Sequence, residues 1–98
     1  MKLEVFMSPG ELASGDVQGR VVAVIDVLRA STSIAAALAN GARTVVPVED
    51  VDEAITRSKQ FERGQVRLAG ERKMLSIPGF DMGNSPLEFT KEAVEDRT

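Results

Sequence analysis

The feature that most constrains the fold is a nearly continuous apolar run, much of it β-branched, from Arg20 to Val27 (RVVAVIDV). Such a run is typical of a strand that is buried on both faces of a parallel sheet. It leads through Asp26 and Arg29 into three consecutive hydroxyl residues and then into an alanine-rich stretch. Because open parallel sheets bind ligands where strands lead into helices, the sequence predicts a functional site at this junction.

The rest of the chain alternates between strand and helix patterns. Helix signals include Gly41 after an alanine-rich stretch and the pair Asp50 and Glu53 as an acidic capping box. A further helix start is Ser85-Pro86, with Glu88 as the reciprocal residue of a capping box. We expect further strands at residues 3–7, 44–48 and 66–69, helices at about 32–39, 50–61 and 85–94, and a long loop from residue 70. This order predicts a layered α/β fold with a mostly parallel sheet and right-handed βαβ crossovers.

The predicted sheet looks incomplete, because the last helix has no returning strand. A chain of 98 residues allows one domain and buries only about 60 to 70% of its unfolded surface. We therefore expect a further segment of polypeptide or a second copy to cover the open sheet.

Composition excludes several classes of function. The net charge of −3 provides no basic surface for nucleic acid or an anionic membrane. The chain has no cysteine and no histidine, which excludes disulfides, thiolate nucleophiles and a histidine general base. It also has neither an apolar signal sequence nor an apolar run long enough to cross a membrane, so the sequence predicts a cytoplasmic protein.

Polar residues gather in three places that would lie at the carboxyl ends of the predicted strands. The first group is Asp26 with Arg29 to Ser33, the second is Glu71 with Arg72, and the third is Asp81 with Asn84 and Ser85. Since the carboxyl ends of parallel strands share one edge of a sheet, the three groups could converge on one rim.

The hydroxyl triplet Ser31, Thr32 and Ser33 has two interpretations. Hydroxyls and free N–H groups at a helix N-terminus can hold a phosphate or sulfonate, with Arg29 as a bidentate clamp. Alternatively, one hydroxyl is the N-cap and Arg29 forms a surface ion pair. The three hydroxyls exceed what a cap requires, and both interpretations stay open.

The carboxylates Asp26, Glu71 and Asp81 are candidates to bind Mg²⁺, which prefers oxygen ligands. The plainer alternative is that they are solvated or paired with nearby arginines. The chain lacks a phosphate-binding P-loop and a dinucleotide fingerprint. Phosphate chemistry would therefore depend on carboxylates, a metal, arginine and helix dipoles.

Four motifs, VIDVLRASTSI, ALANGA, AGER and GFDMGNSPLEFT, resemble in order and spacing the 2-phosphosulfolactate phosphatase (ComB-like) family. The resemblance implies an α/β fold and Mg²⁺-dependent hydrolysis of 2-phospho-3-sulfolactate to 3-sulfolactate, on a route to coenzyme M. It implies arginines and hydroxyls on phosphate or sulfonate, and carboxylates on Mg²⁺ and its water, without assigning a nucleophile. The residues that it implicates are Asp26, Arg29, Ser31, Thr32, Ser33, Glu71, Arg72, Asp81, Asn84 and Ser85.

The sequence departs from the family pattern in two respects. Lys73, Met74 and Leu75 follow AGER where members usually have glycines, and members are much longer. We therefore expect residues 1–98 to be the N-terminal part of a single phosphatase domain that is inactive alone. A non-catalytic module that binds phosphate or sulfate remains the alternative. A haloacid-dehalogenase-like mechanism fits poorly, because Asp26 is not followed by the D-x-D pattern.

Overall fold

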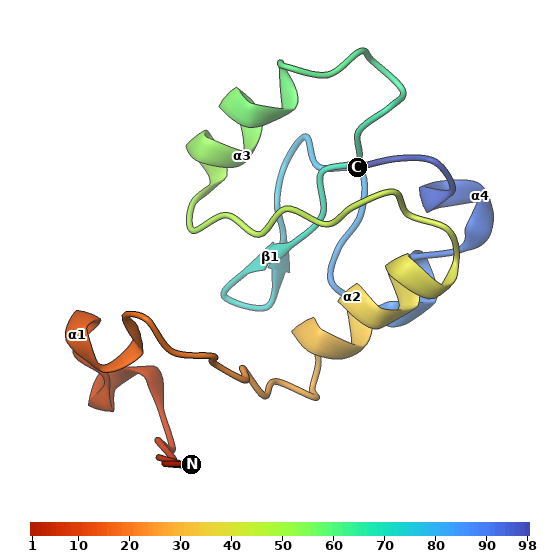
Figure 1. The fold of residues 1–98 in the computed structure, drawn as a ribbon. Coiled ribbons are helices and arrows are strands. Elements are labelled where there is room, and N and C mark those ends of the chain that lie inside the picture. The colour runs from red at the N-terminus through yellow and green to blue at the C-terminus, as the bar shows by residue number, and fades with distance from the viewer.

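The computed structural model describes residues 1–98, and its regular elements are mainly short helices joined by irregular segments (Figure 1). In chain order the elements are η1 (Pro9–Glu11), α1 (Ser14–Val17), α2 (Ala30–Ala39), α3 (Val51–Ser58), β1 (Glu71–Arg72), β2 (Leu75–Ser76), η2 (Pro86–Glu88) and α4 (Lys91–Val94). In Figure 1, η1 and α1 lie together and apart from α2, α3, β1 and α4, at the far end of an extended segment that leads into α2. None of the helices combines the length and apolarity needed to span a membrane.

Helix α2 confirms the helix that was predicted at residues 32–39 and begins two residues earlier. Six of its ten residues, Ala30–Ala39, are alanine or leucine, which favour helix. Asn40 is the C-cap, and Gly41 follows with a positive φ of 95°, which glycine adopts without a steric penalty. The sequence alone therefore predicted both the existence and the end of α2.

Helix α3 confirms the predicted capping by Asp50, whose Oδ1 accepts a hydrogen bond from the backbone N–H of Glu53 at 2.8 Å. The helix ends at Ser58 rather than at the predicted position near Phe61. Phe61 lies beyond the end of the helix, is 40% exposed and lines a cavity. The helix that was predicted for residues 85–94 is divided, because Thr90 starts α4 as a new N-cap after η2.

The predicted long loop contains a two-stranded antiparallel hairpin. Glu71 pairs with Ser76 and Arg72 with Leu75. The two turn residues between the strands, Lys73 and Met74, both have positive φ, as a tight hairpin turn requires. Two residues of the departure from the family pattern, Lys73 and Met74, therefore lie in the hairpin turn, and the third, Leu75, begins β2.

The four segments predicted as strands form no ladder in this chain. Ala69 alone has a bridge, which is parallel and joins it to Met82. Between Val21 and Leu28, six large apolar side chains are 51–103% exposed, and no backbone N–H of residues 21–28 donates a hydrogen bond. A strand needs a neighbour that satisfies its backbone groups, and the N–H groups of residues 21–28 have none. The layered parallel sheet with βαβ crossovers is absent from these 98 residues and stays a prediction.

The core is small, with five buried residues among 98. Ala37 of α2 packs with Phe89 and Val94, which follow η2 and belong to α4 respectively. A cavity of about 250 Å³ lies beside this cluster, between α3 and the extended segments that flank it. The packing is therefore concentrated between α2 and the C-terminal quarter of the chain.

The N-terminal segment is held together by exposed charges. The carboxylate of Glu4 accepts a hydrogen bond from Arg20 and pairs with Nζ of Lys2 at 3.2 Å. The hydrogen bonds from Arg20 and Lys2 lower the pKa of Glu4. Since exposed ion pairs contribute little to the free energy of folding, these charges add little to the stability of the segment.

Candidate functional site

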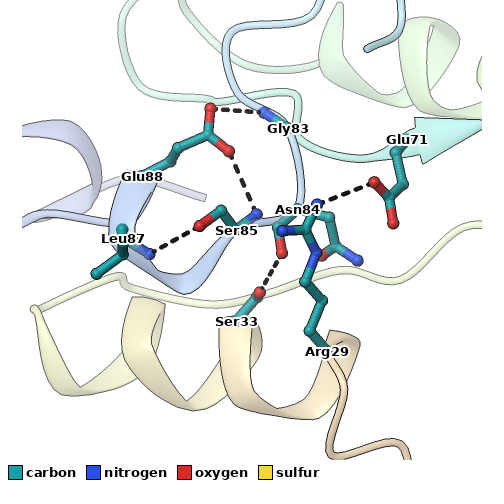
Figure 2. A network of polar contacts seen from close by, with 8 residues as sticks. All are labelled: Arg29, Ser33, Glu71, Gly83, Asn84, Ser85, Leu87 and Glu88. Atoms are coloured by element: carbon teal, nitrogen blue, oxygen red, sulfur yellow. Dashed lines mark hydrogen bonds and ion pairs between the residues drawn. The ribbon is translucent and has the colours of Figure 1, made fainter. Parts of the chain in front are cut away.

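Two of the three predicted polar groups meet at the start of α2. Arg29 is the N-cap residue of this helix, and its Nη2 lies 3.0 Å from Oε2 of Glu71 on β1. Both side chains are partly accessible, with 38% and 30% of their surfaces exposed. The ion pair therefore joins the first and second groups across 42 positions of sequence, as Figure 2 shows.

The third group reaches the same end of α2 through a buried hydrogen bond. Oγ of Ser33 donates to the backbone carbonyl of Asn84 at 2.6 Å, and Ser33 is 2% exposed (Figure 2). Asn84 also has a side-chain amide for which the structure shows no hydrogen bond. The structure thus places Arg29, Glu71, Ser33 and Asn84 together.

Glu88 braces the loop that carries Asn84. Its carboxylate accepts from the backbone N–H groups of Gly83 at 3.1 Å and Ser85 at 3.2 Å, while Oγ of Ser85 accepts from Leu87 N at 3.4 Å (Figure 2). This is the predicted capping box, and it engages Ser85 as a cap. The hydroxyl of Ser85 therefore already accepts a structural hydrogen bond, from the backbone of Leu87.

The hydroxyl triplet does not provide the cap that one interpretation of the sequence expected, although Arg29 forms the ion pair of that interpretation. Arg29 is the N-cap, and no side chain caps α2, so a hydroxyl cap is wrong. Thr32 donates back to the carbonyl of Val27 at 2.6 Å, and Ser33 is buried against Asn84. Ser31 alone has a hydroxyl without a hydrogen-bond partner, and its residue is partly exposed.

The other predicted residues point elsewhere. Asp26 is exposed, and its carboxylate has no hydrogen bond or ion pair. Oδ2 of Asp81 accepts from the backbone N–H of Leu68 at 2.8 Å. Nη2 of Arg72 donates to the carbonyl of Glu49 at 2.5 Å, on the α3 side of the hairpin.

The carboxylates do not form a metal site. Nowhere in the chain do three or more acidic residues lie close enough to hold a cation together. Glu71 and Asp81 use their carboxylates for Arg29 and Leu68, and Asp26 shares no contact with either. As arranged, the three candidates do not fit the Mg²⁺ that the resemblance implies.

A second contact on α2 had no clear signal in the motifs. Nδ2 of Asn40 donates to the carbonyl of Phe89 at 2.7 Å, seven residues after Ser33 on the same helix face. Ser33, Ala37 and Asn40 are spaced four and three residues apart, as residues on one face of a helix are. This spacing is the one sequence signal that could have indicated the face of α2 that packs against the η2 segment.

Comparison with known proteins identifies the family. The sequence model of a family described as 2-phosphosulpholactate phosphatase matches residues 6–98. The chain belongs to the 2-phosphosulfolactate phosphatase family. This confirms the resemblance carried by the four sequence motifs.

Individual relatives of this family match along the whole chain. A Clostridium beijerinckii protein named "Probable 2-phosphosulfolactate phosphatase" is 41% identical over 98 residues, which are all of this chain and 41% of that protein. A protein of the same name from Caldanaerobacter subterraneus is 45% identical over 98 residues, with the same coverage. The chain therefore spans about two-fifths of the length of these 2-phosphosulfolactate phosphatase relatives.

Proposed function

We propose that this chain contributes Arg29, Glu71 and the Asn84 loop to a phosphatase that hydrolyses 2-phospho-3-sulfolactate or a similar small anionic phosphoester. The observation that carries the proposal is the match of residues 6–98 to the family, with relatives named for this reaction. Water adds to phosphorus, the ester P–O bond breaks, and 3-sulfolactate leaves with its hydroxyl restored. The product would serve coenzyme M formation in the cytoplasm.

Arg29 is the best-placed group for the anionic substrate. A guanidinium has five N–H donors, and the ion pair with Glu71 uses one nitrogen at 3.0 Å. The remaining donors can hold phosphate or sulfonate oxygens in a bidentate manner. The free Ser31 hydroxyl and the amide of Asn84 are the neutral donors that we assign to the same anion. Glu71 orients Arg29.

Only the family resemblance supports two parts of this proposal. They are the dependence on Mg²⁺ and the roles of Asp26, Asp81 and Arg72. The three carboxylates do not converge in the chain. No chemical step of this proposal passes through a metal.

The decisive test is phosphate release by a chimera in which residues 1–98 replace the matching part of the Clostridium beijerinckii relative. We expect turnover of 2-phospho-3-sulfolactate, its loss after chelation, and its recovery with Mg²⁺. Arg29→Ala should reduce kcat/KM at least about 100-fold, since a charge-assisted anion contact is lost. Arg57→Ala on α3 is the matched control, because Arg57 pairs with Glu53 away from the site. A folded chimera without phosphate release would contradict the proposal.

The alternative is a module that binds phosphate or sulfate without hydrolysis. The observation that favours it is the hairpin turn, where Lys73 and Met74 replace the usual glycines and add a cation near Glu71. Calorimetry distinguishes the two functions. Binding of inorganic phosphate that needs no Mg²⁺, in a chimera without turnover, would support the module.

A further inference from the structure

We propose that Ser33 is a positioning residue that fixes the Asn84 loop beside Arg29 and does not itself bind the substrate. The inference rests on the proposed function only for its effect on turnover. Ser33 is the most buried residue of the chain, at 2% exposure, and its hydroxyl lies 2.6 Å from the carbonyl of Asn84. A ligand has no access to a side chain at this exposure, although the sequence made Ser33 a candidate anion ligand.

The two hydrogen bonds of Ser33 connect the parts of the site. Its backbone N–H donates to the carbonyl of Arg29 at 3.0 Å, and its Oγ donates to Asn84. The orientation of the arginine's backbone and the position of the loop are therefore coupled through one residue. Because a buried polar group without a partner is costly, the loop is held in the register that satisfies this hydroxyl.

Two side-chain hydrogen bonds, from Ser33 and from Asn40, attach one face of α2 to the segment around η2, and Ala37 packs between them. Ala37, one turn further on, is 3% exposed against Phe89, and Asn40 donates to the carbonyl of Phe89 at 2.7 Å. Ser33 and Asn40 lie about 10 Å apart along the helix axis. Both attach α2 to the segment around η2, but only Ser33 is at the end that holds the Arg29–Glu71 pair (Figure 2).

This geometry offers a matched pair of variants. Ser33→Ala removes the attachment beside the site, and Asn40→Ala removes the one at the far end of the same helix. Each variant deletes one side-chain hydrogen bond to a backbone carbonyl of the η2 segment. Ser33→Thr keeps the hydroxyl and serves as the conservative variant.

The experiment measures steady-state kinetics and amide hydrogen exchange in the chimera described above. In Ser33→Ala we expect exchange at Gly83, Ser85 and Leu87 without ligand to be about tenfold faster, since each such bond is worth about that factor. We expect kcat/KM to fall by a similar factor and Ser33→Thr to restore most of both. Asn40→Ala should lower Tm while leaving turnover and exchange at these amides near the wild-type values.

Unchanged exchange at these three amides in Ser33→Ala would overturn the proposal, as would an equal loss of turnover in Asn40→Ala. Amide exchange is measured without substrate. Faster exchange in Ser33→Ala therefore reports the positioning of the loop and not a lost contact between Ser33 and the anion. If the wild-type chimera releases no phosphate, the proposed function fails. The exchange data then still decide whether Ser33 positions the loop.

Discussion

At the scale of single residues, the site depends on an ion pair and on hydrogen bonds that connect its residues to one another. Glu71 holds Arg29, Ser33 holds Asn84, and Glu88 holds the N–H groups of Gly83 and Ser85. The Arg29–Glu71 pair is partly exposed, so its contribution to stability is at most about 1 kcal/mol. The ion pair therefore matters mainly because it orients the guanidinium of Arg29, and it adds little to the stability of the fold.

The backbone of Gly83 lies close to the carboxylate of Glu88. A Cβ on this residue would lie 2.9 Å from Oε2 of Glu88. We expect Gly83→Ala to push this carboxylate away and to cost about 1–2 kcal/mol through its two backbone hydrogen bonds. Urea unfolding of the chimera measures the change in the free energy of unfolding.

Gly15→Ala in α1 is the control, since a Cβ there meets no atom within 4 Å. Alanine is also the better helix former, so this change should be neutral or slightly stabilising. Equal effects of the two alanine substitutions would show that the close approach of Glu88 to Gly83 is unimportant.

At the scale of elements, local signals predicted α2 and α3, whereas the parallel sheet stays a prediction because the apolar run has no pairing partner in these 98 residues. Asp50 caps α3, Gly41 follows α2 and the Ser85 capping box starts η2, all as the sequence indicated. A helix is stabilised by residues within a few positions of each other, so short signals suffice. The apolar run at residues 20–27 carries a strong strand pattern, yet its pairing depends on distant segments.

The N-cap of α3 provides a prediction at this scale. Asp50→Ala should destabilise the helix by about 1 kcal/mol, because the 2.8 Å bond to Glu53 N is lost. Asp50→Asn keeps a cap oxygen and should have almost no effect. Amide exchange within Val51–Ser58 measures both variants, and equal exchange in Asp50→Ala and Asp50→Asn would contradict the capping role.

At the scale of the whole molecule, an exposed apolar strip dominates. The strip comprises residues 21–28, whose large apolar side chains are 51–103% exposed and whose backbone N–H groups donate no hydrogen bond. Contiguous apolar surface of this kind marks an interaction site. We propose that polypeptide corresponding to the remainder of the relatives' length covers it, because the chain spans 41% of those proteins.

A hydrophobic dye tests the coverage of the strip. We expect the 98-residue chain to bind the dye and to self-associate, and the chimera to be free of dye binding because the strip is paired there. Val24→Lys should reduce dye binding and self-association of the chain, while Met74→Lys, on a separate and equally exposed residue, should change them less. Dye binding retained by a folded chimera would contradict coverage by the added polypeptide, and a dimeric chimera would indicate a second copy.

The family, the positions of α2 and α3 and the chemical types of the candidate residues could all be predicted from the sequence. These properties depend on residue identity and on neighbours a few positions away. The contact of Arg29 with Glu71 across 42 positions and the burial of Ser33 against Asn84 across 51 positions are seen only in the folded chain. The tertiary structure also separates Asp26, Glu71 and Asp81. Such contacts depend on how the chain folds back on itself, which no local pattern specifies.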